Sequence, residues 1–194
     1  TRKSSAASDV YKRQAPDFLA GVGNLLETRG FFEAASNQAR IWLGATTSSE
    51  RVLSIARDGA HVVIVGPTGS GKSELLKLML YSLIEDGICQ LVLFDFKGGA
   101  TLERFEQQAL GLATDLSTTK QVELWDLVAT ELAARETFFS QQKVSSIDAF
   151  NLVSQPLPRI VVVVDEFAAA LASGERATAC LEDVCARGRS LGVH

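Results

Sequence analysis

The stretch G-P-T-G-S-G-K-S at residues 66–73 decides the fold of this chain. The apolar run H-V-V-I-V at residues 61–65 precedes it, and the leucine-rich run E-L-L-K-L-M-L at residues 74–80 follows it. A strand, a glycine-rich loop and a helix in this order make a P-loop, or Walker A motif, whose backbone N–H groups surround the phosphates of a nucleotide. The sequence therefore predicts a strand over residues 61–65, a phosphate-binding loop and a helix over residues 72–85.

Eight residues of this loop are the candidates for binding a nucleotide: Gly66, Pro67, Thr68, Gly69, Ser70, Gly71, Lys72 and Ser73. Glycine lets the backbone come close to phosphate oxygens, and the start of the helix offers unpaired N–H groups and the positive end of a dipole. Lys72 is expected to place its charge at the β- and γ-phosphates, which also makes it a catalytic candidate. The hydroxyl group of Ser73 is expected to coordinate Mg²⁺.

A second motif, V-V-V-V-D-E at residues 161–166, has the form of a Walker B strand. Its apolar strand is expected to carry Asp165 to Mg²⁺, and Glu166 follows directly as a second carboxylate. Phosphoryl transfer to water depends mainly on positioning and charge neutralisation, so Glu166 is the candidate that orients the attacking water. The alternative interpretation is that both carboxylates only cap the helix that follows them.

Strands and helices alternate around these two motifs. Further strands are predicted over residues 41–43, 52–55, 90–96, 111–116 and 159–165. This alternation predicts an α/β fold with a mainly parallel sheet flanked by helices. Gly66, Asp95 and Asp165 are each expected at the end of a strand, and therefore along the one edge of the sheet where ligands bind.

Helices are predicted from Thr101, over residues 118–142 and over residues 167–171. Thr118 and Gln121 have the spacing of a capping box at the start of the second of these helices. Its apolar face is formed by Val122, Trp125, Val128 and Leu132. We therefore expect Trp125 to belong to the core rather than to a contact surface.

The composition of the 194 residues, 46% hydrophobic and 22% charged, suits one globular domain with a sizeable core. No apolar run is long enough to cross a membrane, so a membrane anchor is expected to lie outside this segment. The three cysteines, Cys89, Cys180 and Cys185, lack the spacing of metal ligands. They are expected to pack in the core of a protein in a reducing compartment.

The first fourteen residues stand apart from the rest. Residues 1–14 resemble translated sequencing-adapter sequence and are interpreted as non-native, and residues 15–40 are interpreted as a loosely helical lead-in. The whole chain has a net charge of −4. Residues 1–14 carry four basic side chains and one acidic side chain, which leaves 15 basic and 22 acidic side chains and a net charge of −7 elsewhere. The body of the protein is thus predicted to lack a bulk electrostatic attraction for nucleic acid.

Other classes of nucleotide-binding protein fit the sequence less well. The string D-F-K-G at residues 95–98 matches the D-x-x-G motif of GTPases, which would make Asp95 the acid beside the metal ion. However, no N-K-x-D or T-K-x-D string that would read guanine is present, and a GTPase would leave Asp165 and Glu166 without a role. The L-S-G-G-Q signature of ABC ATPases is also absent from the sequence. We therefore predict ATP, with Mg²⁺, as the nucleotide.

Four strings in order resemble the FtsK/SpoIIIE family of ATP-driven motors over residues 41–194: H-V-V-I-V-G-P-T-G-S-G-K-S-E-L-L, L-F-D-F-K-G-G-A, V-V-V-V-D-E-F and A-R-G-R-S-L-G-V-H. The string D-F-K-G-G-A is more similar to the EccC/EssC ATPases of type VII secretion than to the D-P-K of chromosome translocases. The resemblance implies a RecA-like P-loop ATPase domain in a membrane-tethered ring, commonly a hexamer, at the cytoplasmic face of the bacterial inner membrane. It also implies that the domain is incomplete after His194, where family members continue into another strand.

The resemblance assigns roles to individual residues. Lys72 and Ser73 would act on phosphate and Mg²⁺, Asp165 would bind Mg²⁺, and Glu166 would activate water. Arg187 or Arg189 would reach across a subunit junction to the transferring phosphate, and the sequence leaves open which of them does so. The alternative is that both arginines are solvated helix residues.

Three functional hypotheses follow. The first is an ATP-hydrolysing motor that energises protein export by a type VII-like secretion system. The second is a DNA translocase that moves double-stranded DNA in chromosome segregation or plasmid transfer. The third is a degenerate domain that binds ATP without turnover and serves as a docking module. In RecA-like sheets the strand after His194 lies between the two Walker strands, so residues 1–194 alone are expected to be poorly stable and nearly inactive.

Overall fold

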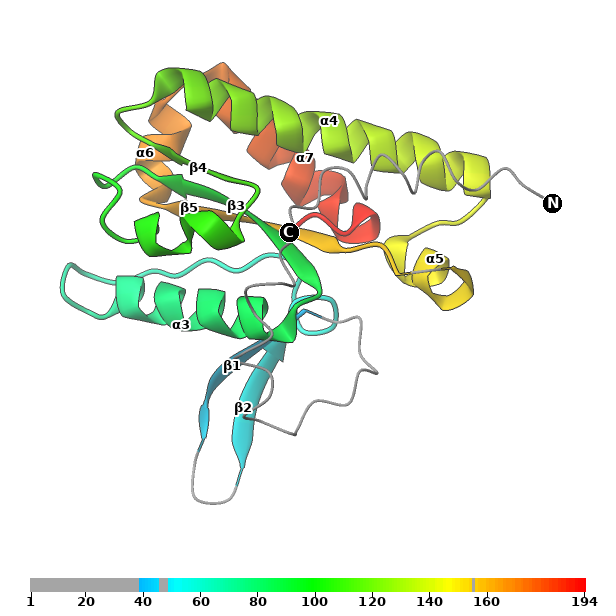
Figure 1. The fold of residues 1–194 in the computed structure, drawn as a ribbon, viewed down its shortest axis with the longest axis horizontal. Coiled ribbons are helices and arrows are strands. Elements are labelled where there is room, and N and C mark those ends of the chain that lie inside the picture. The colour runs from blue at the N-terminus through cyan, green and yellow to red at the C-terminus, as the bar shows by residue number, and fades with distance from the viewer. Residues whose placement is uncertain (1–38, 46–48, 155) are drawn as a thin grey trace. The chain divides into compact units, whose positions relative to one another are not determined.

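A three-stranded parallel sheet lies at the centre of the computed structural model, which describes residues 39–45, 49–154 and 156–194 (Figure 1). The strand order is β4 (Gly111–Thr114), β3 (Cys89–Asp95) and β5 (Arg159–Asp165). Cross-strand partners of Asp95 are Thr114 on one side and Asp165 on the other, so the strands end level with one another. The predicted α/β fold with a parallel sheet is confirmed. The predictions for residues 1–14 and for most of the lead-in fall outside the described residues.

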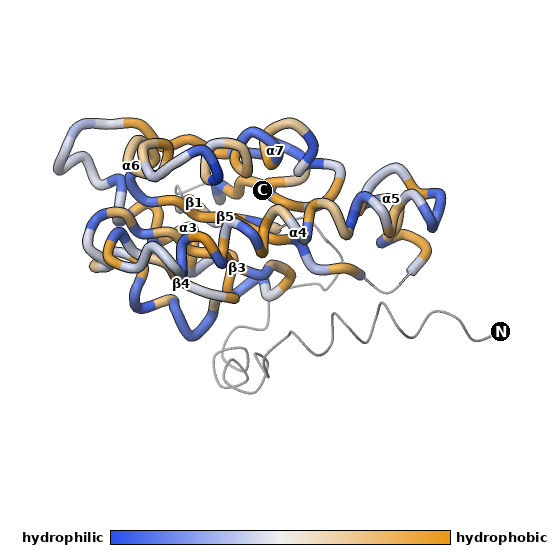
Figure 2. The backbone as a smooth tube through the Cα atoms, turned by 90° about the horizontal axis from the view of Figure 1, so that it is seen from above, coloured by the Kyte–Doolittle hydropathy of each residue, from blue (hydrophilic) through white to orange (hydrophobic). Residues whose placement is uncertain are grey.

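Helices cover both faces of the sheet. Alternate side chains of β3 and β5 point to opposite faces, and those on each face pack against a helix. Leu91, Leu93, Val161 and Val163 share one apolar cluster with Met79, Leu80 and Leu83 of α3 (Lys72–Asp86). On the other face Phe94 stacks on Trp125 of α4 (Thr118–Gln142), with ring centroids 3.7 Å apart. Figure 1 shows α3 on one side of the sheet, and α4 with α7 (Glu175–Leu191) on the other. Burial on both faces explains why β5 reads as a continuous hydrophobic run (Figure 2).

The long helix α4 has the predicted bounds and confirms the buried position of Trp125, but its predicted capping box is wrong. Trp125, Val128 and Leu132 are buried, whereas Val122, one turn earlier, is 39% exposed. The predicted capping box does not form. Ser117, and not Thr118, occupies the N-cap position, and no side chain accepts a hydrogen bond from the first N–H groups of the helix. Gln121 instead donates from Nε2 to the carbonyl oxygen of Thr114, 2.7 Å away. This bond ties the first turn of α4 to the end of β4.

The remaining elements lie around the sheet. The two strands predicted near the start form an antiparallel hairpin, β1 (Arg40–Ala45) and β2 (Glu50–Ser54), and β1 contacts α3. The helix predicted from Thr101 is the short 3₁₀ helix η1 (Glu103–Gln108), and the helix predicted after Glu166 is α6 (Phe167–Ala172). The helices α5 (Ile147–Val153) and α7 were not predicted. No described helix combines the length and the apolar character needed to cross a membrane.

The strand predicted over residues 61–65 is not formed in the described part of the chain, so Gly66 does not follow a strand. Two of its valines are open to solvent, with Val63 81% and Val65 88% exposed. A strand needs a neighbour whose N–H and C=O groups pair with its own, and none of the described strands pairs with this segment. The nearby edge of β5 is paired with Val193 and His194, which run parallel to it. The apolar character of residues 61–65 is therefore real, but the prediction of a strand is wrong for the described structure. No strand of the described sheet pairs with these residues.

Candidate nucleotide-binding site

The loop between residue 65 and α3 has the backbone shape that phosphate binding requires. Gly69 and Gly71 adopt left-handed conformations, with φ of 82° and 89°, which non-glycine residues rarely adopt. A Cβ atom at Gly66 would lie 2.6 Å from Oγ of Ser70, so a side chain there would require Ser70 to move. Gly71 precedes α3 and no side chain caps the start of that helix. The first N–H groups of α3 are thus left to a ligand rather than to a protein side chain.

Lys72 lies within this loop and bonds to its backbone. Its Nζ atom donates to the carbonyl oxygens of Gly66, 2.8 Å away, and Pro67, 3.0 Å away. The ammonium group therefore lies inside the loop, and it forms no ion pair with a described carboxylate. The prediction that Lys72 meets phosphate remains a prediction, and this geometry places its charge at the centre of the loop.

The carboxylate of Asp165 is the group that fits a divalent cation. Asp165 ends β5, and its Oδ2 atom is buried without a hydrogen-bond partner among the described residues. A buried carboxylate oxygen that lacks a donor is suited to a hard cation such as Mg²⁺, which takes oxygen ligands. Figure 1 shows the end of β5 and the start of α3 at the same end of the sheet. Asp165 and Ser73 could hold the ion from these two elements.

Glu166 has an unusual backbone. Its φ of 64° and ψ of 68° put a non-glycine residue in the left-handed region, which costs about 1–3 kcal/mol and is found most often at functional sites. The carbonyl oxygen of Glu166 accepts from the N–H groups of Ala169 and Ala170, so α6 begins here. Its exposed side chain makes no capping bond to that helix. The interpretation that Glu166 merely caps α6 with its carboxylate is therefore wrong.

Asp95 has a structural role. It is fully buried, and it accepts three backbone hydrogen bonds of 3.0 Å: Oδ1 from Lys97, and Oδ2 from Thr101 and Leu102. Both oxygens are engaged in folding the D-F-K-G-G-A string into a turn. The residue is thus not free to act as the metal acid of a GTPase, and the ATPase interpretation is favoured.

The structure separates the two candidate arginines. Arg187 is bound to its own chain: Nη1 pairs with Glu136 of α4, and Nη2 donates to Asp183, 2.8 Å away. Arg189 is exposed and forms no ion pair with any described residue. Of the two candidates, Arg189 is therefore the one whose guanidinium group forms no ion pair with a described residue and could meet an anion outside this chain.

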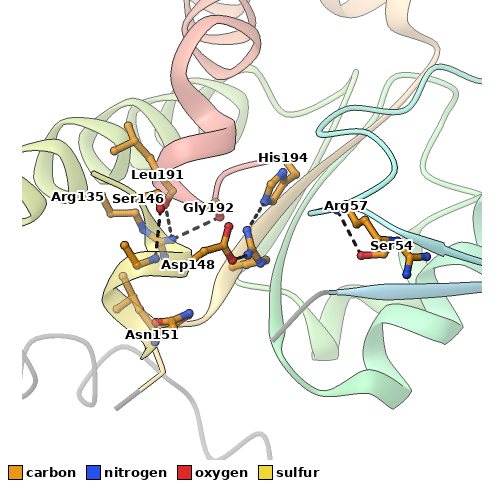
Figure 3. Close-up of polar contacts among 12 residues, drawn as sticks. Ser54, Arg57, Arg135, Ser146, Asp148, Asn151, Leu191, Gly192 and His194 are labelled. Atoms are coloured by element: carbon orange, nitrogen blue, oxygen red, sulfur yellow. Dashed lines mark hydrogen bonds and ion pairs between the residues drawn. The ribbon is translucent and has the colours of Figure 1, made fainter. Parts of the chain in front are cut away.

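Sequence reasoning missed two buried arginines near the end of α7 (Figure 3). Arg135 of α4 donates from Nη1 to Leu191, 3.0 Å away, and from Nη2 to Pro158, 2.8 Å away. Arg159, the first residue of β5, pairs with Asp148 and contacts Nε2 of His194 at 3.1 Å. The sequence could have predicted the burial of Arg135, because this residue continues the helical spacing of Trp125, Val128 and Leu132 on the buried face of α4.

The cysteines differ in environment. Cys89 and Cys180 are buried, and burial raises the pKa of Cys89 to about 12 and that of Cys180 to about 11. Cys185 is exposed, so the prediction of a core position is wrong for this residue, which lies on the outer face of α7. No group of three or more metal-binding side chains occurs in the described ranges. The cysteines thus contribute no metal site there.

Comparisons with known proteins agree with the motif resemblance. The ESX-1 secretion system protein EccCa1 of Mycobacterium tuberculosis is 33% identical over 157 residues, which covers 70% of this chain and 21% of that protein. The cytoplasmic domain of the type VII secretion ATPase EccC of Thermomonospora curvata superposes with a TM-score of 0.70 at 26% identity, covering 84% of this chain and 21% of that one. The chain thus spans about a fifth of the length of either relative.

A further solved structure supports the fold alone. The pCW3 conjugation coupling protein TcpA superposes with a TM-score of 0.69 at 24% identity, over 81% of this chain and 47% of that one. The fold that the family resemblance implies, a RecA-like P-loop domain, is confirmed by these comparisons together. The model that describes the FtsK/SpoIIIE family matches residues 26–194, which include both Walker motifs and both candidate arginines. The chain belongs to the FtsK/SpoIIIE family.

Proposed function

We propose that this chain is an ATP-binding and ATP-hydrolysing motor domain that energises protein export by a type VII-like secretion system. The observation that carries the proposal is the position of two groups at one end of the sheet. One is the P-loop around Lys72, and the other is the buried Oδ2 atom of Asp165, which has no hydrogen-bond partner among the described residues. The similarity to EccCa1 and EccC supports secretion as the process. A ring of copies at the cytoplasmic face of the inner membrane belongs to this proposal.

The residues divide the work of hydrolysis. The backbone of residues 66–73 holds the phosphates, and Lys72 exchanges its bonds to Gly66 and Pro67 for bonds to phosphate oxygens. Ser73 and Asp165 would hold Mg²⁺, which would supply positive charge to neutralise the phosphates. Glu166 accepts a hydrogen bond from the attacking water and so orients it toward the γ-phosphate.

Arg189 is proposed to complete the site of a neighbouring copy. Its guanidinium group is exposed and unpaired within the described chain, whereas Arg187 is held by Glu136 and Asp183. An arginine supplied in this way raises the rate by about 10³–10⁵ in other P-loop enzymes. We therefore expect Arg189→Ala to abolish turnover of the assembled ring while ATP binding persists.

Nucleotide binding and hydrolysis by the purified full-length chain test the proposal. Lys72→Ala should weaken binding of a fluorescent ATP analogue by at least about tenfold, because it removes a charge-assisted contact to phosphate. The matched control is Lys77→Ala on the same helix, since Lys77 pairs only with the exposed Glu74 among the described residues. Binding without turnover in the assembled ring would favour the docking-module hypothesis, and equal binding by both variants would contradict the assigned site.

A further inference from the structure

His194 is buried at the end of a chain of polar contacts (Figure 3). Its Nδ1 atom lies 3.0 Å from the carbonyl oxygen of Ala60, and its Nε2 atom lies 3.1 Å from Nη1 of Arg159. A carbonyl oxygen can only accept, so Nδ1 carries the proton, and a guanidinium group can only donate, so Nε2 is the acceptor. Both contacts are therefore satisfied by the neutral ring in one tautomer.

The backbone between α7 and His194 has no room to move. The N–H group of Val193 donates to the carbonyl oxygen of Gly188, 2.8 Å away, and a Cβ atom at Gly188 would lie 2.2 Å from the oxygen of Val193. Gly192 has a φ of 73°, and a Cβ atom there would lie 2.3 Å from Ile147. Arg135 and the pairing of His194 with Ile160 hold the same turn from two further sides. The backbone of His194 is thus held close to the end of α7, and its ring is oriented by the contacts with Arg159 and Ala60.

Ala60 lies just before the segment that leads into the phosphate-binding loop. Residues 61–65 have no strand partner among the described elements, so neighbouring strands do not fix their position. Two hydrogen bonds lie at the ends of the segment: His194 donates to the carbonyl oxygen of Ala60, and Lys72 donates to that of Gly66.

We infer that His194 is a positioning residue for the phosphate-binding loop, and that its Nδ1–H bond to Ala60 connects the arginine-bearing end of α7 to the Walker A segment of the same chain. The inference rests on the proposed function, because it assumes that residues 66–73 bind ATP. His194 itself touches no nucleotide in this assignment. It acts by fixing the carbonyl group from which residues 61–65 begin.

Two conservative variants separate the two contacts of the ring. The amide of Asn can take the place of Nδ1 and keep a donor for Ala60, whereas the amide of Gln can take the place of Nε2 and keep the contact with Arg159. We expect His194→Gln to weaken binding of a fluorescent ATP analogue to the full-length chain by about fivefold, as for one lost hydrogen bond. His194→Asn should stay within about twofold of wild type, because the bond to Ala60 is the one that positions the loop.

A variant that only destabilises the fold provides the control. Val184 is buried on the same helix and makes no described hydrogen bond to Ala60 or His194, so Val184→Ala should lower Tm without changing the affinity of folded protein for the analogue. Equal affinities for His194→Gln and wild type, or equal losses in the Gln and Asn variants, would overturn the inference. Failure of the wild-type protein itself to bind the analogue would instead contradict the proposed function.

Discussion

Glu166 combines an exposed carboxylate with a left-handed backbone. Glu166→Gln should keep the shape of the side chain and the binding of ATP, but lower kcat by about 10²–10⁴ because the amide cannot accept the proton of the attacking water. Single-turnover hydrolysis and nucleotide retention would measure both effects. Glu175→Gln, an exposed change in the first turn of α7, is the control. Hydrolysis at the wild-type rate in Glu166→Gln would refute the role of Glu166.

His194 makes stability depend on pH. Burial, reinforced by the nearby Arg159 guanidinium, lowers the pKa of His194 to about 4, below the value of about 6.5 expected for an unfolded chain. The folded state then binds fewer protons than the unfolded state between these values, so the free energy of unfolding falls as the pH falls. We expect a loss of about 2 kcal/mol between pH 7.5 and pH 5 from this group. Urea unfolding at both pH values should show a smaller difference in His194→Asn, and an identical difference would contradict the expectation.

At the scale of elements, the end of α7 depends on a cation from α4. Arg135 is fully buried and donates hydrogen bonds to the carbonyl oxygens of Leu191 and Pro158. Without the guanidinium group, these two carbonyl oxygens would lose a hydrogen-bond donor. Arg135→Ala should therefore lower the free energy of unfolding by about 3 kcal/mol or more. Arg176→Ala removes an exposed pair with Asp126 between the same two helices and should change it by less than about 1 kcal/mol. Urea unfolding of both variants would distinguish these outcomes, and equal losses would contradict the assignment.

Elements that depend on local sequence were predicted well. β5 was predicted with its observed ends, because R-I-V-V-V-V-D is bounded by Pro158 and by the start of the next helix. Residues 61–65 are as apolar, yet a strand is defined by its neighbour, and that information is not local. The candidate Walker residues were proposed from spacing alone, and their roles remain predictions. The burial of Arg159 and His194 could not be predicted, because each depends on partners from distant parts of the chain.

At the scale of the whole molecule, charge argues against DNA as the partner. The net charge is −4 for the full sequence and −7 without residues 1–14. We expect no retention of a random-sequence DNA duplex at about 150 mM salt, because phosphate contacts then bring little counterion release. Gel-shift and ATPase assays with and without duplex would test this. Stimulation of hydrolysis by DNA would move the proposal from protein export to DNA translocation.

The contact between His194 and Ala60 also sets an order of events during synthesis. Residues 61–65 leave the ribosome with exposed valines, and the ring that holds the carbonyl oxygen of Ala60 is made more than a hundred residues later. At about 5–20 residues per second, this interval is on the order of ten seconds. During it the nascent chain carries an apolar segment without its anchor, which is the kind of segment that chaperones bind. The phosphate-binding loop therefore gains its contact at Ala60 only after a residue made more than a hundred positions later has emerged.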